Sequence, residues 1–119
     1  MRNFPTFRDF WPFYLQEHAR PATRALHYAG TSLTLLLFLI ALFRHWLWPL
    51  ALLPVAGYGF AWTAHWFVEH NRPATFRYPL WSLAADWVMW FRFLTGRIGH
   101  DLALAGVRPD GSIDPARRL

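Results

Sequence analysis

Three histidines, His18, His27 and His65, stand at the edges of apolar stretches of this chain. A neutral imidazole is the commonest protein ligand of transition metals, and ionisable groups at the edge of a lipid-like segment usually face a partner or a cavity. Three imidazoles with one carboxylate, such as Glu69, suit iron, zinc, copper or manganese. Taken singly, each histidine is most simply structural, so the metal hypothesis depends on an arrangement that brings the three together.

Two long apolar stretches determine where these histidines lie. Residues 25–43 contain no charged residue and only one histidine, His27, and they are long enough to cross a hydrocarbon core of about 30 Å as a helix. Residues 45–68 form a second stretch of this kind. In a helical hairpin, the backbone N–H and C=O groups of both stretches are hydrogen-bonded within the helices, as lipid requires. Small residues such as Gly30 and Ala56 would let the two helices pack closely. A soluble, fully buried hairpin is the alternative.

A hairpin brings distant residues to one level. At about 1.5 Å per helical residue, His27 and His65 lie about 25–30 Å from the connecting turn and near the same membrane face. His18 precedes the helix break at Pro21 and lies at the same edge. His65 and Glu69 are four residues apart and share a helix face. The hairpin therefore predicts that three imidazoles and one carboxylate converge.

The flanking segments complete an all-α fold. Residues 4–15 repeat aromatic side chains at three- and four-residue spacing, which predicts a helix that lies in the membrane interface. Residues 79–98 predict a third apolar helix, half-immersed because Asp86 and Arg92 lie inside it, with a third span as the alternative. We therefore expect a small integral membrane protein with two spans, a single membrane-embedded domain at residues 1–98 and a polar, partly flexible tail at residues 99–119.

The charge pattern indicates a membrane partner. All twelve basic residues are arginines, and they flank the apolar stretches and give a net charge of +5. No basic and aromatic platform or phosphate loop is present, which disfavours nucleic acid. Arg20, Arg24, Arg72 and Arg77 flank the two stretches, against Arg44 in the turn, so the outer ends and the site should face the cytoplasm, at the inner membrane if the source is bacterial. The sequence contains no cysteine, which excludes thiolate ligands. The oligomeric state stays open.

Further polar residues surround the predicted site. His70 is a spare ligand only if the second helix unwinds before Pro73. Asp86 is predicted either to orient a metal-bound histidine or to pair with an arginine. Glu69 is the candidate base, with metal ligand and arginine partner as its alternatives.

Two sequence boxes, YLQEHARPATRALHYAG and HWFVEHNRPA, resemble the membrane family of 2-hydroxy fatty acid dioxygenases of fatty acid α-oxidation. The resemblance covers most of residues 10–95, although the segment between the boxes is shorter than in fungal members, and Ala64 replaces a glycine. The matching positions are Tyr14, His18, His27 and Gly30 in the first box and His65, Glu69, Pro73 and Ala74 in the second.

This resemblance implies a mononuclear Fe(II) enzyme, without haem or 2-oxoglutarate, that uses O₂ to convert a 2-hydroxy fatty acid into CO₂ and the acid one carbon shorter. The three histidines would hold the iron, Tyr14 and Asp86 would support them, and the acyl chain would lie between the spans. The substrate head is expected to meet Arg20, Arg24, Asn71 and Arg72. Two alternatives remain: a non-enzymatic membrane scaffold or metal-binding subunit, and a metal-dependent lipid hydrolase with Glu69 as its base.

Overall fold

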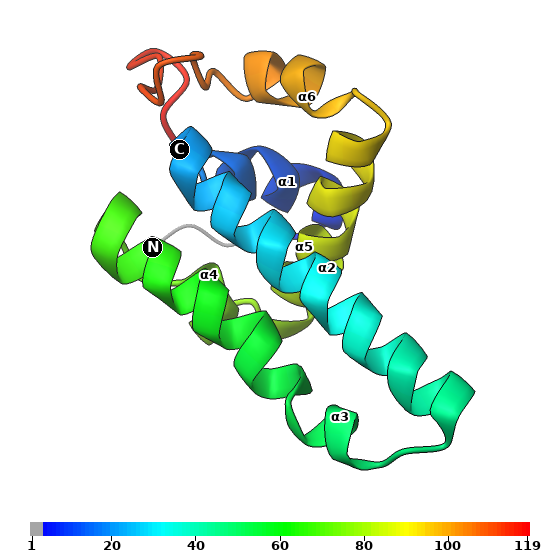
Figure 1. Cartoon of the computed structure of the whole chain (residues 1–119). Coiled ribbons are helices and arrows are strands. Elements are labelled where there is room, and N and C mark those ends of the chain that lie inside the picture. Colours follow the sequence, from blue (N-terminus) through cyan, green and yellow to red (C-terminus); the bar gives the residue numbers. More distant parts are fainter. Residues whose placement is uncertain (1–3) are drawn as a thin grey trace.

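The structure is a computed structural model that describes residues 4–119, so the first three residues of the predicted domain at 1–98 lie outside the described residues. Within residues 4–119 all regular elements are helical, apart from one bridge between Val107 and Ile113. The predicted all-α class is therefore confirmed. The elements, shown in Figure 1, are α1 (Phe7–Gln16), α2 (Pro21–Arg44), α3 (Trp48–Ala51), η1 (Val55–Gly59), α4 (Phe60–Thr63), η2 (Ala64–Glu69), η3 (Ala74–Phe76), α5 (Pro79–Leu94) and α6 (Ile98–Leu104).

The longest helix, α2, runs antiparallel to the segment from α3 to η2 (Figure 1). Pro21 occupies its first turn, where a missing N–H costs nothing, and His45 ends it in the left-handed conformation with φ of 54°. The returning segment is helical from residue 53 to residue 69 and alternates between α and π geometry. This return brings η2 beside the beginning of α2.

One helix within residues 4–119, α2, is long and apolar enough to cross a membrane. Of its apolar stretch of 18 residues, 22% is buried inside the protein. The second predicted span is interrupted, because a turn at Leu52 separates α3 from the helical stretch that follows. The two-span hairpin therefore stays a prediction. The predicted third helix is α5, which ends at Leu94, and its depth in a membrane also stays a prediction.

The beginning of α2 is close to Ala56 and Phe60 on the returning segment. A Cβ atom built on Gly30 would lie 2.8 Å from the backbone oxygen of Ala56 and 3.0 Å from Cβ of Phe60. Side chains larger than hydrogen do not fit at such distances unless the backbone moves. The close packing expected of Gly30 and Ala56 is therefore present, one helical turn after His27.

Helix α1 supplies much of the core. The hydroxyl oxygen of Thr6 caps it by accepting a hydrogen bond from the N–H of Asp9. The apolar stripe predicted at residues 4–15 is present, but much of it faces the protein interior rather than the outside, packed near α5 and α6. In the core cluster around α1, the residues that are at most 1% exposed are Phe10, Tyr14, Leu15, Ala85 and Met89.

The segment after α5 packs back onto α1. The sequence predicted a polar, partly flexible tail at residues 99–119, whereas α6 occupies its first part and contributes to the core. The side-chain nitrogen of Gln16 donates to the backbone oxygens of Ala105 and Arg117, at 2.9 and 2.8 Å. Its side-chain oxygen accepts from the N–H of the last residue at 2.8 Å. The buried hydrophobic side chains of this segment are Leu102, Ala105 and Val107.

Candidate metal centre

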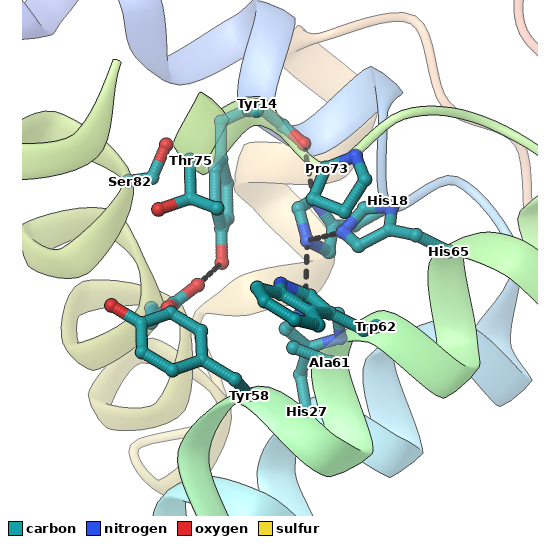
Figure 2. A pocket seen from close by; sticks show the side chains of 12 residues that line it. Tyr14, His18, His27, Tyr58, Ala61, Trp62, His65, Pro73, Thr75 and Ser82 are labelled. Atoms are coloured by element: carbon teal, nitrogen blue, oxygen red, sulfur yellow. Dashed lines mark hydrogen bonds between the residues drawn. The ribbon is translucent and has the colours of Figure 1, made fainter. Parts of the chain in front are cut away.

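Three buried imidazoles from different parts of the chain meet at one point (Figure 2). His18 lies in the turn between α1 and α2, His27 lies in α2, and His65 lies in η2. The Nε2 atom of His18 is 3.0 Å from Nε2 of His27 and 3.1 Å from Nε2 of His65. One ring nitrogen from each histidine lies within 4.8 Å of the other two. The structure thus brings together the three histidines that the sequence singled out.

The second ring nitrogen of two of these histidines is bonded to the backbone. Nδ1 of His18 donates to the carbonyl oxygen of Tyr14 at 2.6 Å, and Nδ1 of His27 donates to the carbonyl oxygen of Thr23 at 2.9 Å. Because a carbonyl oxygen only accepts, the proton of each neutral ring lies on Nδ1. The Nε2 atoms of His18 and His27 therefore present lone pairs.

Asn71 fixes the third ring in the same tautomer. Its side-chain nitrogen donates to the backbone oxygen of Glu17 at 3.0 Å and to the Glu17 carboxylate, which sets the orientation of the amide. The amide oxygen then accepts from Nδ1 of His65 at 2.6 Å. The sequence predicted that Asn71 contacts the substrate, whereas the structure places it behind a metal-ligand candidate.

The distances from Nε2 of His18 to Nε2 of His27 and of His65 fit a metal ion. With metal to nitrogen bonds of about 2.1 Å, two ligands at right angles are about 3.0 Å apart. The separations of 3.0 and 3.1 Å on either side of His18 match that value. Lone pairs this close repel one another unless a cation lies between them. The donor set therefore fits a divalent transition metal and leaves further coordination positions for small ligands.

Burial keeps His18 in the neutral form that a metal requires. Its side chain is 1% exposed. Loss of contact with water is the largest cause that lowers the pKa of His18 well below its usual range, and the neighbouring His27 and His65 lower it further. Metal binding competes with protonation of the imidazole. A lowered pKa therefore keeps Nε2 of His18 available at neutral pH.

Tyr14 and Asp86 form a buried pair beside the histidines. The ring of Tyr14 stacks on the ring of His18 with centroids 4.1 Å apart, and its hydroxyl donates to the carboxylate of Asp86. Burial, and then the charge of Asp86, raise the pKa of Tyr14, so the phenol keeps its proton. Asp86 supports the site through Tyr14, because each histidine Nδ1 already donates to another oxygen.

Two charged residues that the sequence assigned to substrate or catalysis hold chain segments together. Arg24 donates from Nη1 to the backbone oxygens of His18 and Ala19, at 2.9 and 2.7 Å. The carboxylate of Glu69 accepts from the backbone N–H of Arg20. These bonds connect the turn that carries His18 to α2, and the end of η2 to the start of α2.

The remaining candidates lie around the rim. His70 follows η2 in the left-handed conformation with φ of 60°, and its exposed side chain lies outside the group of three histidines. The guanidinium of Arg72 lies over the ring of Phe76, 5.2 Å from its centroid. Within residues 4–119, the residues that line the cavity beside the histidines include none of the three arginines predicted to bind the substrate head: Arg20, Arg24 and Arg72.

A larger groove adjoins this cavity. The cavity has a volume of about 20 Å³, which is room for a water-sized group, and the groove has a volume of about 260 Å³. His27, Tyr58 and Asp86 line both. Trp62 and Ser82 are among the cavity residues that the sequence analysis missed, although each had a helical spacing that could have found it. Trp62 precedes His65 by three residues and Ser82 precedes Asp86 by four.

Within residues 4–119, these features define a class of protein: an all-helical fold with one helix apolar enough to cross a membrane and three buried histidines that could hold a metal ion. The chain belongs to the family described as 2-hydroxy-palmitic acid dioxygenase Mpo1-like, which it matches over residues 4–98. The family resemblance seen in the two sequence boxes is thereby confirmed. Searches among curated proteins and among solved structures returned no match.

Proposed function

We propose that this protein is an Fe(II)-dependent dioxygenase that cleaves 2-hydroxy fatty acids. The observation that carries the proposal is the set of three buried imidazoles, His18, His27 and His65, whose Nδ1 atoms are occupied and whose Nε2 atoms converge. The family description, which names a 2-hydroxy-palmitic acid dioxygenase, supports the substrate class and the use of O₂.

The proposed reaction breaks the bond between C1 and C2 of the substrate. One 2-hydroxy acid and one O₂ give one CO₂, one water and the fatty acid one carbon shorter, which balances all atoms. Nε2 of His18, His27 and His65 would hold a single Fe(II), and the chemistry that this ion would supply is the activation of O₂.

The protein residues around the iron would fix the imidazoles and the cavity wall in place, and none of them would transfer a group. The backbone oxygens of Tyr14 and Thr23 and the amide oxygen of Asn71 fix the three imidazoles in one tautomer. The phenol of Tyr14 keeps its proton and holds the Asp86 carboxylate at the cavity wall. We assign Glu69, through its bond to the N–H of Arg20, the role of fixing η2 against α2.

We also propose that the far end of α2 lies in a lipid bilayer and that the site faces the cytoplasmic side. Large apolar side chains are exposed along this half of the molecule, where a lipid environment would cover them. A substrate whose head reacts while its tail stays in the bilayer needs its site at the interface. The exposed residues between the middle of α2 and α3 include Leu36, Phe38, Leu42, Phe43, Leu47 and Trp48.

Oxygen uptake tests the proposed reaction. Protein purified without oxygen and loaded with Fe(II) should consume one O₂ for each CO₂ released from 2-hydroxyhexadecanoic acid, and mass spectrometry should detect pentadecanoic acid. Hexadecanoic acid, which lacks the 2-hydroxyl group, is the matched control and should cause no uptake. Product formation without O₂ would indicate a hydrolase instead. Metal binding without any turnover of 2-hydroxy acids would indicate the non-enzymatic scaffold or metal-binding subunit.

A further inference from the structure

Two residues that line the cavity beside the histidines carry buried hydrogen-bond donors without an acceptor. Within residues 4–119, Nε1 of Trp62 and the hydroxyl of Ser82 have no hydrogen-bond partner, although both atoms are buried. Both side chains line the cavity, as Figure 2 shows. A buried donor that lacks an acceptor costs about 1–3 kcal/mol. The cavity is therefore suited to a group that brings acceptor oxygens.

The groove that adjoins this cavity is mostly apolar and leads away from the histidines. Along α2 it is lined by His27, Thr31 and Thr34, which cover about 10 Å at about 1.5 Å per residue. It therefore extends toward the end of α2 where large apolar side chains are exposed. Its opposite wall is formed by residues from the returning segment and from α5, namely Leu53, Pro54, Gly57, Tyr58, Leu83, Asp86 and Trp87.

We infer that the cavity and the groove bind one single-chain amphiphile, with its head oxygens on Trp62 and Ser82 and its acyl chain in the groove past Gly57. His27, Tyr58 and Asp86 line both spaces, so the cavity and the groove are neighbours, and the inferred amphiphile would extend from one into the other. The inference rests on the proposed function, because a 2-hydroxy fatty acid is such an amphiphile. The inference assigns recognition of the substrate head to the neutral donors of Trp62 and Ser82 rather than to the arginines that the sequence predicted.

Gly57 determines how much room the acyl chain has. A Cβ atom built there would lie 3.7 Å from the hydroxyl oxygen of Thr34, which is an ordinary contact, so the backbone tolerates a side chain that would fill the groove. Gly59, two residues further along η1, is exposed and lies outside the groove lining. The variants Gly57→Leu and Gly59→Leu therefore form a matched pair.

The first experiment measures chain-length preference. With Fe(II)-loaded protein in detergent micelles, Gly57→Leu should lower kcat/KM for 2-hydroxyhexadecanoic acid by about tenfold or more, equivalent to about 1.4 kcal/mol. It should leave 2-hydroxyhexanoic acid, which is too short to pass Gly57, within about twofold. Gly59→Leu should change neither value. An equal loss on both substrates, or no loss, would overturn the acyl part of the inference.

The second experiment measures binding to the metal-free protein and so does not depend on catalysis. Ser82→Ala and Trp62→Phe should each weaken binding of 2-hydroxyhexadecanoic acid by about fivefold to tenfold, as expected for loss of one buried hydrogen bond. Hexadecylamine, whose head has no acceptor oxygen, should bind all variants equally. Ser32→Ala is the control, because the Ser32 hydroxyl accepts from Nε1 of Trp90 at 2.9 Å, away from the cavity. Equal losses for both ligands would overturn the head assignment.

The two hypotheses fail in different ways. If the protein binds 2-hydroxy acids with the expected variant pattern but consumes no O₂, the proposed function is wrong and the binding mode stands. If it consumes O₂ but Gly57→Leu and Ser82→Ala show no selective loss, the binding mode is wrong and the proposed function stands.

Discussion

The two ends of this molecule are stabilised in different ways. At the histidine end, α1, α5 and the C-terminal segment bury their apolar side chains against one another, and Phe10 and Leu15 are fully buried. At the far end, where α2 turns into α3, the corresponding side chains are exposed: Leu36 is 54%, Phe43 74% and Leu47 81% exposed. One end thus supplies its own packing, and the other end leaves large apolar side chains exposed.

We assign the two ends different roles: the histidine end positions the imidazoles, and the far end anchors the protein in the bilayer. The imidazoles lie at the end where protein groups fix every ring through a hydrogen bond to Nδ1. The exposed apolar surface at the other end is of the kind that marks an interaction site, and we assign it to the bilayer. Changes at the histidine end should therefore affect metal binding, whereas changes at the far end should affect membrane insertion.

The largest effect is expected from removal of one imidazole. His27→Ala takes away one of three converging nitrogen ligands, and affinity for Fe(II) should fall by about 100-fold or more. Metal content measured after anaerobic gel filtration checks this expectation. His100→Ala, an exposed histidine on α6, is the control and should bind metal as the unchanged protein does. Equal metal content in the two variants would refute the ligand assignment.

The far end can be tested with a second matched pair. Leu36 on α2 and Leu104 on α6 are both exposed, at 54% and 65%, but they lie at opposite ends. If α2 crosses the bilayer, Leu36→Asp should disfavour insertion by about 2.5–3.5 kcal/mol, because a carboxylate is expensive near the membrane centre. The fraction of protein that remains in carbonate-washed membranes measures the change.

Leu104→Asp should leave that fraction nearly unaltered, because we place α6 outside the hydrocarbon. A uniform response, with both variants retained or both released, would remove the distinction between the two ends.

A smaller effect is expected from the support behind His65. Asn71→Leu removes the acceptor for Nδ1 of His65 while keeping all three imidazoles. Loss of such a partner typically lowers metal affinity about 10–100-fold, so this variant should lie between the unchanged protein and His27→Ala in a competition titration with Fe(II). Thr63→Val is the control, since the Thr63 hydroxyl donates only to the backbone of Gly59. Unaltered affinity in Asn71→Leu would show that the ring is held by packing alone.

The sequence predicted the histidine convergence because it follows from helix rise and chain reversal, which hold for every residue on the two stretches. It did not predict the positions of Arg24, Glu69 and Asn71, because a charged or polar residue has several partners within reach and only the fold selects one. Ser82 was missed because its uncharged hydroxyl did not draw attention, although it lies four residues before Asp86 on the same helix face. The packing of the C-terminal segment depends on Gln16, about 100 residues away in sequence, and no local pattern encodes such a contact.

The smallest effect is expected at Gly30, where α2 packs closely against the returning segment one turn after His27. In Gly30→Ala, the added methyl group would lie 2.8 Å from the backbone oxygen of Ala56, so α2 and the returning segment must separate slightly. Overpacking of this kind costs about 1–3 kcal/mol, and Tm should fall by about 5 °C. Gly99→Ala, where the new atom meets nothing within 4 Å, should not lower Tm, because alanine favours a helix more than glycine does. Because His27 lies one turn before Gly30, the same displacement should weaken Fe(II) binding by a few-fold. A fall in Tm with full metal affinity would show instead that the histidine end is positioned independently of the contact at Gly30.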